Sequence, residues 1–164
     1  MIALEITDRK DFTKQLFLQE TFDGFLLTEA VFTTSCTFTI DGSLNRSYYE
    51  EAEWEEIGDR QYETWKALRA HCFQLIKGSK LPVGFRITLR MKPGNVERIL
   101  EQNDLVGMFE VESLQLNILY KNGEITCTTG IALRQFTMDK ALDQAWDRMV
   151  RKFFQKQQIA YRES

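Results

Sequence analysis

The stretch of residues 113–157 most narrows what this chain can fold into, because it predicts a β-hairpin followed directly by a helix. Apolar residues alternate over Leu114–Tyr120, which is the period of a half-buried strand. Asn122-Gly123 then predicts a type I′ turn, since both central residues of that turn need a positive φ. A return strand and a third segment over residues 131–136 extend the hairpin. We therefore expect a meander of antiparallel strands.

A long amphipathic helix is predicted after the meander. Asp139 is the expected N-cap, and apolar residues then recur at spacings of three and four along one stripe. The stripe consists of Leu142, Ala145, Trp146, Met149, Val150, Phe153 and Phe154. We expect it to pack on the sheet face that bears Leu116 and Ile118, with Trp146 as its main anchor.

The segments upstream predict further strands and only two short helices. Alternating apolar residues indicate strands over 2–6, 25–33, 36–40, 70–77 and 81–91. One short helix is expected around Phe12 and Leu16, and another begins at Pro93, since proline suits the first turn of a helix. The prediction is a single α+β domain over residues 1–164. Its largely antiparallel, hairpin-built sheet packs against two short helices and a long C-terminal helix.

The predicted core takes its members from all of these segments. It consists of Leu4, Phe12, Leu16, Leu27, Phe38, Phe85, Ile87, Leu89, Leu116, Ile118, Trp146, Met149 and Phe153.

A short pattern occurs twice in the chain. Residues 38–44 and 136–142 both have the form F-T-apolar-D-x-small-L, and each follows a run of strand, short helix and strands. Two explanations stay open, namely chance and a duplicated β-α-β-β unit. Sliding-clamp domains are built from duplicated units of this kind, so duplication would predict a clamp-like fold by analogy.

Composition restricts the class of protein and its environment. A net charge of -3 argues against a protein that coats nucleic acid generally. No signal peptide and no apolar run long enough for a bilayer are visible, so we expect a cytoplasmic protein without a membrane partner. Cys36, Cys72 and Cys127 are odd in number and far apart, and we expect them buried in strands.

No catalytic or metal-binding constellation is predicted. His71 is the only histidine, and no G-x-S-x-G motif is present that could supply an activated serine. The carboxylates of residues 50–59 lack the spacing of a calcium loop. We therefore predict no catalytic residues, no metal and no cofactor, and an enzyme is the less favoured class.

Two polar turns are candidates for ligand binding. Lys77 and Lys80 flank Gly78-Ser79, which resembles part of a phosphate loop, although a strand rather than a helix is predicted to follow. Thr128 and Thr129 precede Gly130 in a second hydroxyl-bearing turn. Simple structural turns are the favoured explanation of both segments, and ligand binding is the alternative. If the fold brings them together, Lys77, Lys80, Thr128 and Thr129 would line one pocket.

Two other segments are candidates for contact with a partner. An acidic run over residues 50–59 lies beside Tyr48 and Tyr49 and contains Trp54. It predicts either a solvated connection or a surface that contacts a protein. The C-terminal half of the last helix carries four cations, Arg148, Arg151, Lys152 and Lys156. The helix dipole favours cations there, and a face for nucleic acid or an acidic partner is the alternative.

Several motifs together resemble a family of small uncharacterised bacterial proteins over the whole chain. The motifs are Thr37-Phe38-Thr39-Ile40-Asp41-Gly42, Leu75-Ile76-Lys77-Gly78, Cys127-Thr128-Thr129-Gly130 and Asp139-Lys140 with Trp146-Asp147. The resemblance implies a single cytoplasmic bacterial domain of unknown function. It implies no activity, cofactor or site.

Three functions are hypotheses at this level. The leading one is a non-catalytic protein-binding or adaptor module with a protein partner of unknown identity. The alternatives are a clamp-like protein associated with nucleic acid, and a small-ligand-binding protein or enzyme with a pocket near Lys77 and Thr128. The sequence leaves the oligomeric state open.

Overall fold

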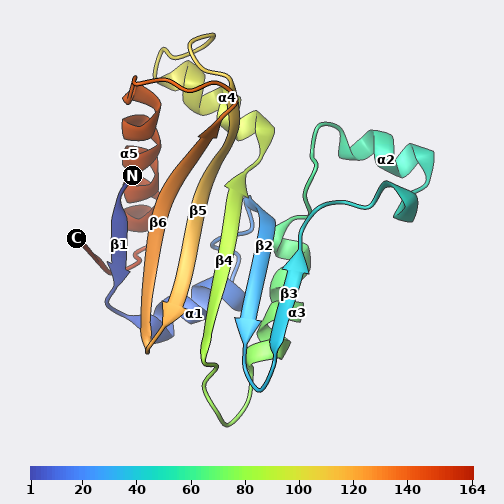
Figure 1. The fold of residues 1–164 in the computed structure, drawn as a ribbon, viewed down its shortest axis with the longest axis vertical. Coiled ribbons are helices and arrows are strands. Elements are labelled where there is room, and N and C mark those ends of the chain that lie inside the picture. Colours follow the sequence, from blue (N-terminus) through green and yellow to red (C-terminus); the bar gives the residue numbers. More distant parts are fainter.

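Seven antiparallel strands form one sheet in the computed structural model, which describes residues 1–164 (Figure 1). The strand order is β3-β2-β4-β5-β6-β1-β7. The strands are β1 (Ala3–Ile6), β2 (Phe25–Thr33), β3 (Thr37–Asp41), β4 (Gly84–Met91), β5 (Val111–Lys121), β6 (Glu124–Leu133) and β7 (Tyr161–Glu163). The predicted α+β class and antiparallel sheet are confirmed.

Five α-helices accompany the sheet, so the prediction of only two short helices beside the last one is wrong. They are α1 (Arg9–Phe17), α2 (Glu51–Ile57), α3 (Trp65–Ile76), α4 (Pro93–Gln102) and α5 (Ala141–Lys156). Figure 1 shows α1 and α3 behind the sheet, α5 beside β1, α4 at the upper end and α2 away from the body. None of the helices has both the length and the apolar character needed to cross a membrane.

The central hairpin forms where it was predicted. Asn122 and Gly123 connect β5 to β6 with φ values of 54° and 77°, which confirms the positive-φ turn. The predicted third segment is not separate, because residues 131–133 continue β6. Phe136 lies beyond the strand and is 90% exposed. The meander therefore consists of β4, β5 and β6.

The predicted strand over residues 70–77 is wrong, because this segment belongs to α3. Thr64 caps the helix, and its hydroxyl accepts a hydrogen bond from the backbone N–H of Ala67. Trp65 and Cys72 lie two turns apart on the buried side of the helix. The predicted strand begins at residue 70, after the first turn of the helix. The prediction therefore takes account of neither the capping residue nor the helical spacing of the apolar residues.

Side chains alternate along the strands, so one face of the sheet is buried and the other is open. In β4, Phe85, Ile87 and Leu89 are buried in the core. Arg86 and Thr88 point to the opposite face, as predicted, and remain exposed or half-buried. Figure 1 shows that no helix covers this open face. α1, α3, α4 and α5 therefore enclose one core on one side of the sheet.

The predicted core is buried with three exceptions. Phe38 is 37% exposed because β3 is an edge strand with a neighbour on only one side. Met149 is 36% exposed on α5. Phe153 is half-buried and packs edge-on against Phe22 and Phe25 at the margin of the core.

The strand order gives no support to a duplicated, clamp-like fold. In the second half of the chain, β4, β5 and β6 are consecutive neighbours in the sheet. In the first half, β1 is separated from β2 by all three of those strands. A duplicated unit predicts the same order in both halves, and the observed order differs. The first copy of the F-T-x-D pattern begins in β3, whereas the second begins beyond the end of β6.

Candidate functional site

A pocket of about 710 Å³ opens between α1, the end of α3 and the loop of residues 77–82, at the lower end of the sheet in Figure 1. We call it the cationic pocket. It is lined by Arg9, Lys10, Thr13, Lys14, Leu18, Phe73, Ile76, Lys77, Gly78, Lys80, Leu81, Pro82, Phe85, Tyr120 and Ile125. Its volume lies within the range of about 300–1,000 Å³ that is typical of small-molecule sites.

Two side chains of α3 join this helix to the C-terminal end of α1, beside the pocket. The indole N–H of Trp65 donates a hydrogen bond of 2.8 Å to the backbone oxygen of Leu16. The guanidinium of Arg69 donates to the backbone oxygen of Phe17 and forms an ion pair with Asp23. These bonds connect the C-terminal end of α1 to the first half of α3. The opening is lined by residues along the whole length of α1 and by the last turn of α3.

The floor of the pocket is the end of the hydrophobic core. Phe85 and Tyr120 are neighbours across β4 and β5, and their rings stack at 5.2 Å with an angle of 15° between their planes. Ile125, from the start of β6, is paired with Tyr120 and is buried. Phe73 and Ile76 close the side formed by α3. A ligand in the pocket would therefore meet aromatic and aliphatic surface.

Five cationic side chains surround this apolar floor, and no carboxylate does. They are Arg9, Lys10, Lys14, Lys77 and Lys80. None of them takes part in any of the ion pairs of the structure. The guanidinium of Arg9 donates a hydrogen bond to the backbone oxygen of Gly123, which holds it against the β5–β6 turn. The result is an uncompensated positive charge around an apolar cavity.

Helix stability explains only part of this charge. Lys14 lies in the last turn of α1 and Lys77 caps the end of α3, where the helix dipole favours cations. Arg9 and Lys10 occupy the first turn of α1, where the dipole disfavours them. Lys80 lies in a loop. Three of the five cations therefore have no explanation in the helices that carry them.

Two exposed leucines stand at the mouth of the pocket. Leu18 follows α1 and is 54% exposed, and Leu81 in the loop is 83% exposed. Burying such apolar surface is favourable by about 25 cal/mol per Å². A ligand with an apolar part would cover side chains that water now surrounds.

Only two of the four predicted ligand-binding residues lie in the pocket. Lys77 and Lys80 line it, whereas Thr128 and Thr129 lie about 10 and 13 Å further along β6 than Ile125. Thr128 half-faces solvent on the open side of the sheet, opposite Asn117. The two turns therefore do not share one pocket.

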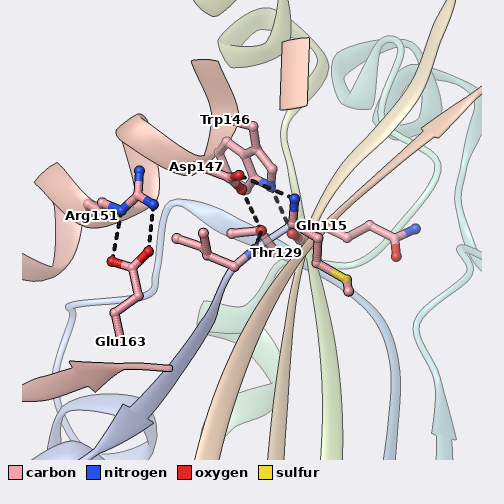
Figure 2. A network of polar contacts seen from close by, with 8 residues as sticks. Gln115, Thr129, Trp146, Asp147, Arg151 and Glu163 are labelled. Atoms are coloured by element: carbon pink, nitrogen blue, oxygen red, sulfur yellow. Dashed lines mark hydrogen bonds and ion pairs between the residues drawn. The ribbon is translucent and has the colours of Figure 1, made fainter. Parts of the chain in front are cut away.

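Thr129 takes part in a buried polar network instead (Figure 2). Its hydroxyl donates a hydrogen bond of 2.6 Å to Asp147 and accepts one of 3.0 Å from the backbone N–H of Ile2. Beside it, the indole of Trp146 donates to the backbone oxygen of Gln115 at 2.9 Å. These bonds join β1, β5, β6 and α5, so their role is structural.

The cations of α5 are mostly engaged. Arg151 forms two hydrogen bonds with the carboxylate of Glu163, at 3.0 and 2.6 Å (Figure 2). Arg148 donates to the side chain of Asn103 at 3.3 Å. Lys152 and Lys156 are exposed and form none of the ion pairs. Two unengaged lysines are a weak basis for a nucleic-acid surface.

The acidic aromatic segment forms an arm over residues 43–64 that projects from the body and contains α2 (Figure 1). Backbone bonds from Leu44 to Gln61 close its base. Near its tip, Tyr49 contacts both Tyr48 and Trp54, at ring separations of 5.3 and 5.6 Å. Tyr48 is 82% exposed, whereas the other two rings are half-buried.

A second cavity of about 750 Å³ lies between the arm and the start of α4. Its lining mixes four carboxylates with Arg60 and Lys92. No group of side chains in the structure has the arrangement of a metal site. This cavity therefore lacks both the apolar floor and the single sign of charge that distinguish the cationic pocket.

The basic residues of α1 were missed at the sequence level. Arg9, Lys10 and Lys14 complete the rim that Lys77 and Lys80 begin. The available signal was the pair of cations in the first turn of a predicted helix, where the dipole disfavours them. No sequence pattern predicted that α1 would lie close to residues 77–82.

A family model matches residues 15–162 of the chain, which is most of its length. The chain belongs to DUF5721, a family of unknown function. This confirms the resemblance to an uncharacterised family. Comparison with curated proteins and with solved structures found no match. The match to DUF5721 includes Lys77 and Lys80, whereas Arg9, Lys10 and Lys14 precede its first residue.

Proposed function

We propose that this protein binds a small organic anion in the cationic pocket. The observation that carries the proposal is the rim of five cations without a carboxylate, set around an apolar floor. Like charges held close together repel one another, and a bound anion relieves that repulsion. The cations face solvent, so the attraction is screened by salt and each contact is of moderate strength.

The lining of the pocket supports binding without turnover. It contains no histidine, cysteine, aspartate or glutamate. These are the residues that most often act as general base, general acid or nucleophile. A ligand held here would meet charge, hydrogen-bond donors and apolar surface. We therefore favour a binding protein over an enzyme.

The proposal is tested by titrating the full chain with 8-anilinonaphthalene-1-sulfonate, an aromatic anion that fluoresces in apolar surroundings. The double variant Lys10→Gln/Lys80→Gln should bind it about three- to tenfold more weakly, because exposed charge pairs contribute roughly 0.2–1 kcal/mol each. Added salt should weaken wild-type binding as well.

The matched control is Lys66→Gln/Lys152→Gln, which removes two exposed lysines outside the pocket. It lowers the net charge by the same amount and should keep wild-type affinity. An equal loss in the control would mean that only the overall charge matters. That result, or unchanged binding in Lys10→Gln/Lys80→Gln, would refute the proposed site.

A protein-binding role of the arm is the second candidate function. It is supported by the exposed Tyr48 on an acidic projection that stands apart from the sheet (Figure 1). Exposed aromatic side chains are typical centres of protein interfaces. A partner recovered with the wild-type chain should be lost with Tyr48→Ser. It should be retained with Phe136→Ser, which removes another highly exposed ring away from the arm.

A further inference from the structure

The apolar part of the cationic pocket indicates which small organic anions can bind there. This inference rests on the proposed function. Inorganic anions need only the charged rim and would leave the half-buried Phe73, Ile76 and Tyr120 of the lining in contact with water. The floor is continuous with the core, and the mouth adds the exposed Leu18 and Leu81. A ligand that uses the whole cavity must carry both an anionic group and a sizeable apolar group.

The polar groups that would recognise a nucleotide are absent from the lining. A base edge or a sugar is usually held by amides, carboxylates and hydroxyls. Thr13 and Tyr120 supply the only hydroxyl groups of the lining, and neither an amide nor a carboxylate side chain is present. Buried base edges without partners would oppose binding. The apolar group of the ligand is therefore unfunctionalised.

We propose that the ligand is an anionic amphiphile, namely an alkyl chain that ends in a carboxylate or a phosphate. Its chain lies over the half-buried Phe73, Ile76 and Tyr120, beneath Leu81. Its anionic head stays at the mouth, among the lysines of α1 and of the loop. In this orientation the anionic head stays partly in water and the alkyl chain is buried. It matches the lining, in which the cations surround the mouth and the apolar residues lie deeper.

The proposal predicts that affinity rises with chain length. Calorimetric titration of the full chain with butyrate, hexanoate, octanoate and decanoate should show a gain of up to about fourfold for each added methylene. That ratio corresponds to ~0.8 kcal/mol per buried CH₂. Decanol, which lacks the charge, should bind at least tenfold more weakly than decanoate. Decyl phosphate should bind at least tenfold more tightly than adenosine monophosphate.

Matched variants locate the chain in the pocket. Leu81→Asn should reduce decanoate affinity several-fold and leave butyrate affinity unchanged, since it removes apolar contact and no charge. Leu81 is 83% exposed, so the variant should fold normally. Val106→Asn is the control, because Val106 is 66% exposed and lies outside the pocket. It should bind both ligands as the wild type does.

The outcomes separate this inference from the proposed function. One outcome is equal affinity for butyrate and decanoate, with weaker binding of both in Lys10→Gln/Lys80→Gln. It would refute binding of the alkyl chain and would still support the anion site. Loss of neither ligand in that double variant would overturn both. Binding to phosphatidylglycerol vesicles without binding to free decanoate or decyl phosphate would assign the pocket to a membrane surface and overturn the free amphiphile.

Discussion

The hydroxyl of Thr129 donates a hydrogen bond of 2.6 Å to the carboxylate of Asp147, which joins the middle of β6 to α5 (Figure 2). The two residues are 1% and 7% exposed. The same hydroxyl accepts a hydrogen bond from the backbone N–H of Ile2, so it both donates and accepts. A buried carboxylate needs such partners, because an unsatisfied polar group in the core is costly.

Thr129→Val should therefore destabilise the protein by about 1–3 kcal/mol, the cost of leaving a buried hydrogen-bonding group without its partner. Urea denaturation at neutral pH measures this as a lower midpoint with an unchanged slope. The neighbouring Thr128→Val makes the same chemical change on the open face and should stay within about 0.5 kcal/mol of wild type. Equal losses in the two variants would contradict the structural role of Thr129.

Trp146→Ala should cost about 3–5 kcal/mol, the range for truncating a large aromatic side chain in a core. Trp146 is 1% exposed, and its indole donates to the backbone oxygen of Gln115. Trp146→Phe keeps most of the apolar bulk and should lose only about 1–2 kcal/mol with the hydrogen bond. Trp54→Ala, on the arm, is the control and should cost about 1 kcal/mol or less. Near-wild-type unfolding of Trp146→Ala would show that α5 does not depend on this anchor.

The pair of Arg151 and Glu163 predicts a pH effect at the C-terminal strand. The hydrogen bonds from Arg151 lower the pKa of Glu163 below its ordinary value of 4.5. A lowered pKa means that the contribution of Glu163 to stability is present above about pH 4.5 and is lost as the pH falls through the folded-state pKa. An NMR titration of this carboxyl should show the lowered pKa in the wild type.

Arg151→Gln removes the cation and should return the pKa of Glu163 toward 4.5. Lys152→Gln removes the adjacent charge without touching the carboxylate and should leave this pKa unchanged. The same titration curve in wild type and Arg151→Gln would mean that the two side chains are not paired in solution.

The three cysteines should differ in reactivity. Cys36 is exposed in the turn between β2 and β3, which contradicts the expectation that all three are buried in strands. Burial raises the pKa of Cys72 to about 12 and also raises that of Cys127, and the thiolate is the reactive form. With 5,5′-dithiobis(2-nitrobenzoic acid) at pH 8, we expect one thiol to react quickly and the other two only in denaturant. Cys36→Ser should abolish the fast phase, and a second fast thiol in the native protein would contradict the burial.

Several elements could be predicted because their signals are local. Asn122-Gly123 marks the central turn, and the alternation from Phe85 to Leu89 identifies the buried face of β4. α3 was missed although Thr64 and the spacing of Trp65 and Cys72 indicate a helix. The short apolar run at residues 70–77 fits either period when its cap is ignored. The information for this helix was therefore present in the chain.

The candidate site could not be predicted in the same way. Lys77 and Lys80 were identified from a loop motif, but they were grouped with Thr128 and Thr129, which the fold places elsewhere. Successive strand residues point to opposite faces, so Thr128 and Thr129 cannot serve one site together. The residue types in both turns suggested ligand binding. Only the arrangement of the sheet shows that the two turns lie apart.

The sequence by itself determined the α+β class, the central hairpin, the open polar face of β4 and most of the core, because strand period, turn chemistry and burial act over a few neighbouring residues. The tertiary structure alone decided that β1 lies beside β6 and not beside β2. It also decided that Arg9 and Lys10 face Lys80 across an apolar floor. Strand order and helix packing depend on the sum of many contacts between residues distant in the sequence, each worth less than thermal energy. No local pattern records which of the possible arrangements has the lowest free energy.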